Sequence, residues 1–223
     1  MTRFFSSIQI LRPLNMILCI VSVLVAAWLI GGLFSPLLPY TVLVVFFFAG
    51  ASNILNDVLD FHIDKVNRSR RVLPSGRLSI GHAIGIMGVM YAAGIISAIY
   101  LEPLGKQIAF VIVLPLLVLY TPLFKNLPFI GNVVVGILLG LVFIFTEGAL
   151  NGSVGKMWIP FYLVTTLSTI RELAKDAEDV EGDSIANLQT FPLKFGLIAT
   201  LWLLRILAIF LCFGALLPWM EGW

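Results

Sequence analysis

The chain has 223 residues, of which 60% are hydrophobic and only 12% are charged, and its formal net charge is +2. Soluble domains carry charge on about a quarter of their residues, so this composition excludes an ordinary soluble domain and predicts a polytopic membrane protein. No Cys/His cluster supports zinc chemistry, and we expect no nucleic acid among the partners. Cys19 and Cys212 both fall in apolar segments and are expected to be buried small side chains.

Several stretches are long and apolar enough to cross a membrane, since a helix needs about 20 apolar residues to span the hydrocarbon core. Prolines punctuate most of the junctions between them, and no Ser-, Gly- or Pro-rich linker divides the chain. We therefore expect residues 1–223 to form a single all-α transmembrane domain. In chain order, the seven predicted spans are 14–33, 39–59, 81–101, 106–124, 130–150, 157–175 and 192–216.

The basic residues predict the orientation of these spans. Most of the 14 Lys and Arg residues fall on the side of the membrane that holds the amino terminus. By the positive-inside rule, that side is cytoplasmic, and seven spans then leave the carboxyl terminus outside. We expect an integral protein of the inner (cytoplasmic) membrane, with connections 2–3 and 6–7 facing the cytoplasm.

An acidic pattern, Asp-x-x-Asp-x-x-x-Asp, occurs twice, and both copies lie on the predicted cytoplasmic side. Spacings of three and four place the carboxylates of each copy on one stripe of a helix. Like charges in that arrangement repel each other, so they indicate a bound cation. Two copies on the same side of the membrane can form one site. The copies are Asp57/Asp60/Asp64 and Asp176/Asp179/Asp183.

Basic residues next to the acidic copies indicate an anionic ligand. Arg68 and Arg71 follow the first copy, and Lys175 flanks the second. Mg²⁺ prefers oxygen ligands and usually sits between carboxylates and substrate phosphates, while arginine complements phosphate oxygens in bidentate fashion. The combination predicts a metal–diphosphate clamp. For the first copy, the alternative is a solvated loop of alternating charge, which the adjacent Asn53 and Asn56, inside the end of an apolar span, make less favourable.

For each of three further residues, the sequence leaves two alternative roles open. Lys125 reaches a phosphate or anchors a helix end at the interface. Tyr120 turns its ring toward developing positive charge or belongs to an aromatic belt. Arg205, inside the last span, faces the protein interior or a polar cavity, or snorkels to the interface.

Three segments of the chain together resemble the UbiA superfamily of intramembrane prenyltransferases. Residues 56–68, with Arg71 and residues 73–77, resemble the first aspartate motif of that family, and residues 175–183 with 190–192 resemble the second. Tyr120-Thr121-Pro122 with Lys125 and residues 131–132 is similar to the central Tyr-Ser-Pro-x-x-Lys segment. Ser69 and Val72 stand where the family usually has prolines.

The resemblance implies a helical bundle whose central cavity opens toward lipid and binds Mg²⁺ and a polyprenyl diphosphate. The prenyl group would pass to a lipophilic acceptor. The second motif most resembles the digeranylgeranylglyceryl phosphate branch, with aromatic, quinone-precursor or chlorophyll-type acceptors as alternatives. Family members usually have nine spans, so the last two helices are expected to be missing here.

The site residues expected from this chemistry and resemblance fall into three groups. Mg²⁺ is expected on Asp57, Asp60, Asp64, Asp176, Asp179 and Asp183. The diphosphate is expected on Asn53, Asn56, Arg68, Arg71, Lys125 and Lys175. Catalytic roles are expected for Asp64, Asp179 and Tyr120.

Other classes of membrane protein fit the sequence less well. CDP-alcohol phosphotransferases are also aspartate-rich, but their Asp-Gly-x-x-Ala-Arg run is missing. A transporter that used Asp57 or Arg205 as relay charges would need acidic groups near the middle of the membrane. A non-enzymatic scaffold remains an alternative.

Overall fold

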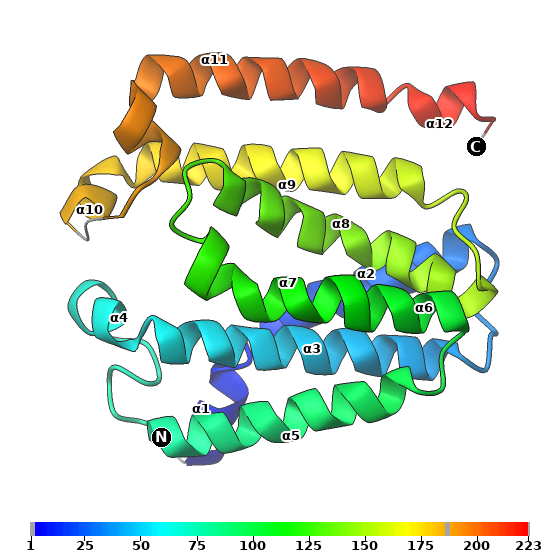
Figure 1. Cartoon of the computed structure of the whole chain (residues 1–223), viewed down its shortest axis with the longest axis horizontal. Helices are drawn as coiled ribbons and strands as arrows, with labels where there is room; N and C mark the ends of the chain where they lie inside the picture. Colours follow the sequence, from blue (N-terminus) through cyan, green and yellow to red (C-terminus); the bar gives the residue numbers. More distant parts are fainter. Residues whose placement is uncertain (1–2, 186–187, 223) are drawn as a thin grey trace. The chain divides into compact units, whose positions relative to one another are not determined.

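The computed structural model describes residues 3–185 and 188–222, and its regular structure there is entirely helical. The all-α fold class is therefore confirmed. Figure 1 shows the elements in chain order. They are α1 (Arg3–Gln9), α2 (Pro13–Leu29), α3 (Leu38–Leu59), α4 (Phe61–Asn67), α5 (Ile80–Ala98), α6 (Pro103–Gln107), η1 (Ile108–Val113), α7 (Leu114–Leu119), η2 (Tyr120–Phe124), α8 (Ile130–Asn151), α9 (Trp158–Glu178), α10 (Val180–Ile185), α11 (Phe191–Gly214) and α12 (Leu217–Met220).

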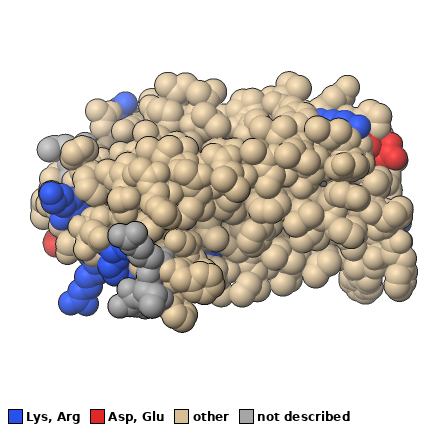
Figure 2. All heavy atoms as spheres, turned by 90° about the horizontal axis from the view of Figure 1, so that it is seen from below, with Lys and Arg blue, Asp and Glu red and all other residues tan. Residues whose placement is uncertain are grey.

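Every predicted span coincides with a helical stretch. Among the described residues, five stretches are long and apolar enough to cross a membrane, and α2 is a shorter apolar helix. Helix α9 corresponds to the remaining span and has 21 residues, but its second half carries Arg171, Glu172 and Lys175. On the face drawn in Figure 2, charged side chains lie near the ends and the part between them is almost wholly uncharged, as expected of a surface in contact with lipid.

The fourth span is a composite helix. It runs from Pro103 to Phe124 as α6, η1, α7 and η2, in which η1 and η2 have π-helical geometry. At its end the backbone N–H of Lys125 donates to Tyr120 O at 2.8 Å, five residues back. The predicted span 106–124 is helical, and two prolines, which lack the N–H that a regular α-helix would use, lie next to its π-helical parts: Pro115 just after η1 and Pro122 within η2.

The chain forms two compact units. The first comprises Met1–Val118 and Phe145–Val154, and the second comprises Leu119–Ile144 and Gly155–Trp223. The first acidic motif belongs to the first unit and the second motif to the second unit. The expectation of one domain over residues 1–223 stays a prediction.

In the first unit, α3 packs against α5 and α2. Gly94 on α5 permits the close packing against α3, since a Cβ added there would lie 2.5 Å from the Phe48 ring. Gly105 on α6 permits a similar approach to α8, where an added Cβ would lie 2.5 Å from Ala149 Cα. Such small residues are typical of helices that approach closely in lipid.

Cys19 is half-buried, so the expectation of a buried side chain holds only in part.

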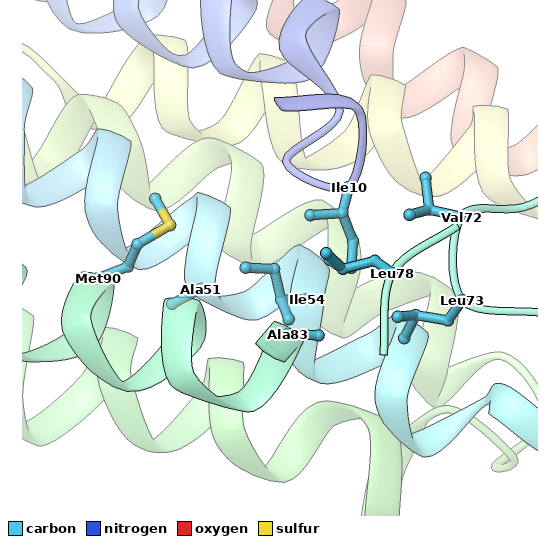
Figure 3. Packing of buried hydrophobic residues seen from close by; sticks show 8 residues of the cluster. All are labelled: Ile10, Ala51, Ile54, Val72, Leu73, Leu78, Ala83 and Met90. Carbon is cyan, nitrogen blue, oxygen red and sulfur yellow. The ribbon is translucent and has the colours of Figure 1, made fainter. Parts of the chain in front are cut away.

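An apolar cluster supports the loop that follows the first motif. Figure 3 shows side chains from four segments, namely the α1–α2 junction, α3, the loop and α5, directed toward one another. This packing fixes the loop against the ends of α3 and α5, so the basic residues of the loop are held beside the motif. The cluster comprises Ile10, Ala51, Ile54, Val72, Leu73, Leu78, Ala83 and Met90.

In the second unit, α9 packs against α8 and α11. A Cβ added at Gly136 would lie 2.6 Å from Thr165 O, and one at Gly140 would lie 2.7 Å from Phe161 O, so both glycines are needed for the contact with α9. On the α11 side, the Tyr162 hydroxyl donates to Phe210 O at 2.8 Å. Cys212 on α11 is exposed, so the prediction that its side chain is buried is wrong.

Candidate functional site

The two acidic motifs share one local backbone structure. Helix α3 ends at Leu59 and α4 begins at Phe61, with Asp60 between them at φ −83° and ψ 1°. Helix α9 ends at Glu178 and α10 begins at Val180, with Asp179 between them at φ −91° and ψ 11°. In each motif, the first aspartate lies on a long helix and the last on a short one.

The expectation of one unbroken helix through each motif is therefore wrong, because the helix breaks at the middle aspartate. The break is slight. The N–H of Asp60 still donates to Asn56 O, and that of Asp179 to Lys175 O, both at 2.9 Å. The stripe of carboxylates is consequently bent but keeps its helical spacing. Figure 1 shows the short helices α4 and α10 beyond the ends of α3 and α9.

Two carboxylates of the first motif are buried and paired with arginine. Asp57 is 6% exposed and Asp64 is 4% exposed. Arg71 Nη1 lies 2.5 Å from Asp64 Oδ2 and 3.3 Å from Asp57 Oδ1, so this guanidinium bridges the two carboxylates. Arg12 Nη2 lies 2.5 Å from the same Oδ1 atom of Asp57. Buried charges require such partners.

Arg12 is a residue of this cluster that the sequence analysis missed as a site residue. It lies 45 positions before Asp57, at the start of the first apolar span. Its only signal in the sequence was a positive charge at a predicted membrane boundary, which the positive-inside rule explains without any site. Tertiary structure alone brings it to the motif.

The other predicted residues around the first motif have varied surroundings. Asn53 Nδ2 donates to Leu11 O at 3.0 Å and therefore ties α3 to the α1–α2 junction. Asn56 and Asp60 are half-buried. Arg68 has an exposed side chain, and its backbone N–H closes α4 by donating to Asp64 O at 2.8 Å.

In the second motif, Asp176 is the carboxylate with the most defined contacts. The buried Asn132 donates from Nδ2 to Asp176 Oδ2 at 2.7 Å. Asp176 lies just beyond the apolar part of α9, and burial raises its pKa; the hydrogen bond from Asn132 lowers that pKa and the charge of Asp183 raises it. Asn132 is thus a second residue absent from the predicted site, although it belongs to the family-like segment at 131–132.

Other charged groups of the second motif are more open to solvent. Asp179 and Lys175 are exposed, and Asp183 is half-buried. Lys175 Nζ lies 3.7 Å from a Glu172 carboxylate oxygen. Exposed pairs of this kind contribute little to stability, so Lys175 is available to exchange Glu172 for another anion.

Tyr120 and Lys125 lie at the ends of η2, in the same unit as the second motif. Both side chains are half-buried. The turn into α8 is tight: a Cβ at Gly131 would lie 3.0 Å from Phe124 O and 3.1 Å from Lys125 O, so this position favours glycine. The turn leads directly to Asn132 and hence to Asp176.

Arg205 does not face the protein interior. Its side chain is exposed on α11, and the guanidinium lies over the Trp202 ring at 4.9 Å from the centroid. Of the two interpretations, an interior or cavity-facing Arg205 is therefore contradicted, whereas snorkelling to the interface stays a prediction. On the helix surface, the neighbouring Trp202 ring accommodates the charge.

A pocket of about 440 Å³ lies beside the first motif, between Phe61 of α4, the loop around Leu73–Ser79 and His82 of α5. Arg77 in its wall donates to Gln9 Oε1 at 2.7 Å and to Arg70 O at 2.6 Å. Because its lining includes none of the predicted site residues, this pocket is separate from the carboxylate cluster.

The donor chemistry of the motifs fits Mg²⁺. The side chains supply carboxylate and amide oxygens, several of them buried, which are the ligands that this ion prefers. Over residues 3–185 and 188–222, no group of three or more His, Cys, Asp or Glu side chains gathers closely enough to hold a metal alone. An ion here would need further oxygen ligands, and phosphate oxygens and water commonly complete such a shell.

Comparison with known proteins decides the family. Residues 17–223 match the UbiA prenyltransferase family. The chain belongs to this family. It is therefore an integral membrane prenyltransferase, and the sequence-based resemblance is confirmed.

Several relatives of the chain are digeranylgeranylglyceryl phosphate synthases. The one from Natronomonas pharaonis is 30% identical over 223 residues, covering 100% of this chain and 80% of the relative. The one from Methanoculleus marisnigri is 33% identical, covering 97% and 77% of the two chains.

Solved structures confirm the fold. A structure of digeranylgeranylglyceryl phosphate synthase in membranes has a TM-score of 0.83 and 26% identity, covering 100% of this chain and 79% of that one. A UbiA homologue from Archaeoglobus fulgidus, bound to DMAPP and Mg²⁺, has a TM-score of 0.76 and 18% identity, covering 94% and 76%. At this identity, the second likeness supports the fold alone.

Proposed function

We propose that this UbiA-family prenyltransferase catalyses Mg²⁺-dependent transfer of a polyprenyl group from its diphosphate to geranylgeranylglyceryl phosphate. The observation that carries the proposal is the repeated motif: two Asp-x-x-Asp-x-x-x-Asp segments bend at the same residue and each holds a buried or half-buried carboxylate next to hydrogen-bond donors. Each segment would hold Mg²⁺ through carboxylate oxygens, and the ion would supply positive charge to a bound diphosphate.

The first motif supplies metal ligands and cations within hydrogen-bonding distance of each other. Asp57 and Asp64 would ligate the ion, directly or through water, and Asp60 lies between them at the bend. Arg71, which already contacts two carboxylates, and Arg68, whose side chain is exposed, can bind diphosphate oxygens in bidentate fashion. Bound Mg²⁺ would supply Lewis acidity that neutralises the charge developing on the leaving diphosphate.

The second motif would complete the site with Asp176, Asp179 and Asp183. Asn132 orients the Asp176 carboxylate through the 2.7 Å hydrogen bond, and oriented ligands bind metals better than free ones. Lys125 and Lys175 would bind phosphate oxygens. The Tyr120 ring would face the allylic carbon as it becomes positively charged. Asp64 or Asp179 would take the proton of the acceptor.

The joint site rests on two supports. Both motifs are predicted to lie on the cytoplasmic side of the membrane, where charged diphosphates are present. The Archaeoglobus fulgidus homologue of the same fold binds DMAPP and Mg²⁺. We therefore propose an active site that faces the cytoplasm of the inner membrane.

The acceptor is inferred from relatives that cover nearly the whole chain. The similar proteins from Natronomonas pharaonis and Methanoculleus marisnigri are digeranylgeranylglyceryl phosphate synthases, so the acceptor proposed is a prenylated glyceryl phosphate. An aromatic or quinone-precursor acceptor is the alternative that the test must separate.

The decisive experiment is a product assay on the purified protein in detergent or lipid. Labelled geranylgeranyl diphosphate is offered with geranylgeranylglyceryl phosphate, an aromatic quinone precursor or a chlorophyll-type acceptor, and the products are identified by mass spectrometry. We expect a prenylated glyceryl phosphate that forms only with Mg²⁺. An aromatic product alone would overturn the acceptor assignment.

Site variants test the metal assignment in the same assay. Asp60→Asn and Asp183→Asn should each lower turnover at least roughly 100-fold, because removing a metal ligand should cost no less than losing a residue that orients one. Glu181→Gln is the matched control, since Glu181 is an exposed acidic residue beside Asp183 that lies outside the repeated pattern. Parent-like turnover in both aspartate variants would refute the site.

A further inference from the structure

The α1–α2 junction is held in an unusual backbone conformation at Arg12. Its φ of 56° and ψ of 71° place it in the left-handed region, which non-glycine residues rarely adopt. The N–H of Arg12 donates to Gln9 O at 3.1 Å, and its carbonyl accepts from the N–H of Asn15 at 2.9 Å. Such strained residues persist only where the surrounding structure determines them.

Three contacts from the first unit determine this junction. Asn53 Nδ2 donates to Leu11 O at 3.0 Å. Ile10 is 1% exposed and packs in the apolar cluster, where Figure 3 shows it directed toward Leu78 and Ile54. Arg77 Nη1 donates to Gln9 Oε1 at 2.7 Å. The three residues that precede Arg12 are thus anchored, and this fixes the backbone of Arg12 in place.

The fixed backbone places the Arg12 guanidinium on a proposed metal ligand. Arg12 Nη2 contacts Asp57 Oδ1 at 2.5 Å, and Arg71 Nη1 contacts the same oxygen at 3.3 Å. The Asp57 side chain is 8% exposed, whereas that of Arg12 is 34% exposed. A metal that binds Asp57 through Oδ1 must therefore compete with a guanidinium, and that guanidinium can move toward solvent or toward another anion.

We propose that Arg12 is a positioning residue that holds the Asp57 carboxylate in place before the ligands bind, and that leaves Asp57 Oδ1 when the metal takes that oxygen. The inference rests on the proposed function of this site. A divalent cation alone that binds Oδ1 displaces Arg12 without any new partner for the guanidinium. With diphosphate present, the displaced guanidinium has an anion to pair with, so the metal and diphosphate favour each other's binding.

The test is metal binding without substrate, measured on the whole protein in detergent. Mn²⁺, an oxygen-seeking ion detected directly by EPR, stands in for Mg²⁺. Arg12→Gln should bind Mn²⁺ about tenfold more tightly than the parent, because a charge-assisted hydrogen bond no longer competes for Asp57. Arg12→Lys retains the positive charge and should stay near the parent value.

A second measurement separates exchange from simple competition. Binding of labelled inorganic pyrophosphate at saturating Mg²⁺ should be weaker in Arg12→Gln than in the parent, because the displaced guanidinium no longer pairs with the anion, so the coupling between metal and pyrophosphate falls. If pyrophosphate affinity stayed at the parent value while Mn²⁺ binding tightened, Arg12 would only compete with the metal and the exchange would be refuted.

The matched control is Arg70→Gln. Arg70 is an exposed arginine of the loop after the first motif, and its side chain takes no part in the three contacts that fix Arg12, so Mn²⁺ affinity should remain at the parent value. Tighter Mn²⁺ binding in Arg70→Gln would assign the effect to the loss of any positive charge near the motif and overturn the proposal, as would unchanged or weaker Mn²⁺ binding in Arg12→Gln. A parent protein that bound no pyrophosphate with Mg²⁺ would instead refute the proposed function.

Discussion

Removing the Arg71 guanidinium, which bridges two carboxylates of the first motif, should destabilise the protein more than removing that of the exposed Arg68. Arg71→Met keeps an apolar stem and deletes the charge that contacts Asp64 at 2.5 Å and Asp57 at 3.3 Å. Breaking a buried ion pair by removing one partner costs about 3–5 kcal/mol. We expect about 3 kcal/mol, because Asp57 retains Arg12 and the Arg71 side chain is 26% exposed.

A loss of that size should lower the apparent unfolding temperature by roughly 6–12 °C in a chain of this length. The assay is thermal unfolding in detergent with EDTA, followed by tryptophan fluorescence at one scan rate, since unfolding of membrane proteins is commonly irreversible. Arg68→Met is the control: Arg68 is exposed, and we expect a change of at most about 0.5 kcal/mol.

A double-mutant cycle with Asp64→Asn tests the cause of the loss. Once Asp64 is neutral, deleting Arg71 should destabilise the protein less than it does in the parent, so the two changes should be clearly non-additive. Equal temperature shifts for Arg71→Met and Arg68→Met, or additive effects in the cycle, would show that the bridge does not stabilise this site.

Three further predictions concern packing, ligand orientation and the metal. Gly105→Ala should destabilise the fold by about 1–3 kcal/mol through overpacking, because the new Cβ would lie 2.5 Å from Ala149 Cα. The control Gly85→Ala should not destabilise it, since nothing lies within 4 Å of the added Cβ; equal unfolding temperatures of the two variants would refute the overpacking. Asn132→Ala should raise the pKa of Asp176 further, since the hydrogen bond from Asn132 lowers it. Because protonation of Asp176 opposes metal binding, the midpoint of Mn²⁺ binding against pH should move to higher pH; a shift to lower pH would contradict the role of Asn132 in orienting Asp176. Removal of divalent ions with EDTA should stop diphosphate release and added Mg²⁺ should restore it, whereas release that continues in EDTA would exclude metal dependence.

The fold class and the positions of the long helices could be predicted from the sequence because they depend on local quantities. Apolar length decides whether a helix spans the hydrocarbon core, and every predicted span coincides with a helical stretch. The acidic motifs and their basic neighbours were equally visible, since spacings of three and four have a direct meaning on a helix.

Tertiary structure decided which charges meet. Arg12 and Asp57 are 45 residues apart, and Asn132 and Asp176 are 44 apart; no local pattern connects residues so distant in the chain. The bends at Asp60 and Asp179 could not be predicted from the sequence either. Both residues retain helical hydrogen bonds to the preceding turn, so the acidic spacing is that of a continuous helix. The sequence by itself determined the spans, the acidic motifs and the family resemblance, because these depend on local composition and spacing. Packing of the α1–α2 junction against α3, and of α8 against α9, determined which side chains partner the carboxylates, since those partners lie far apart in the chain.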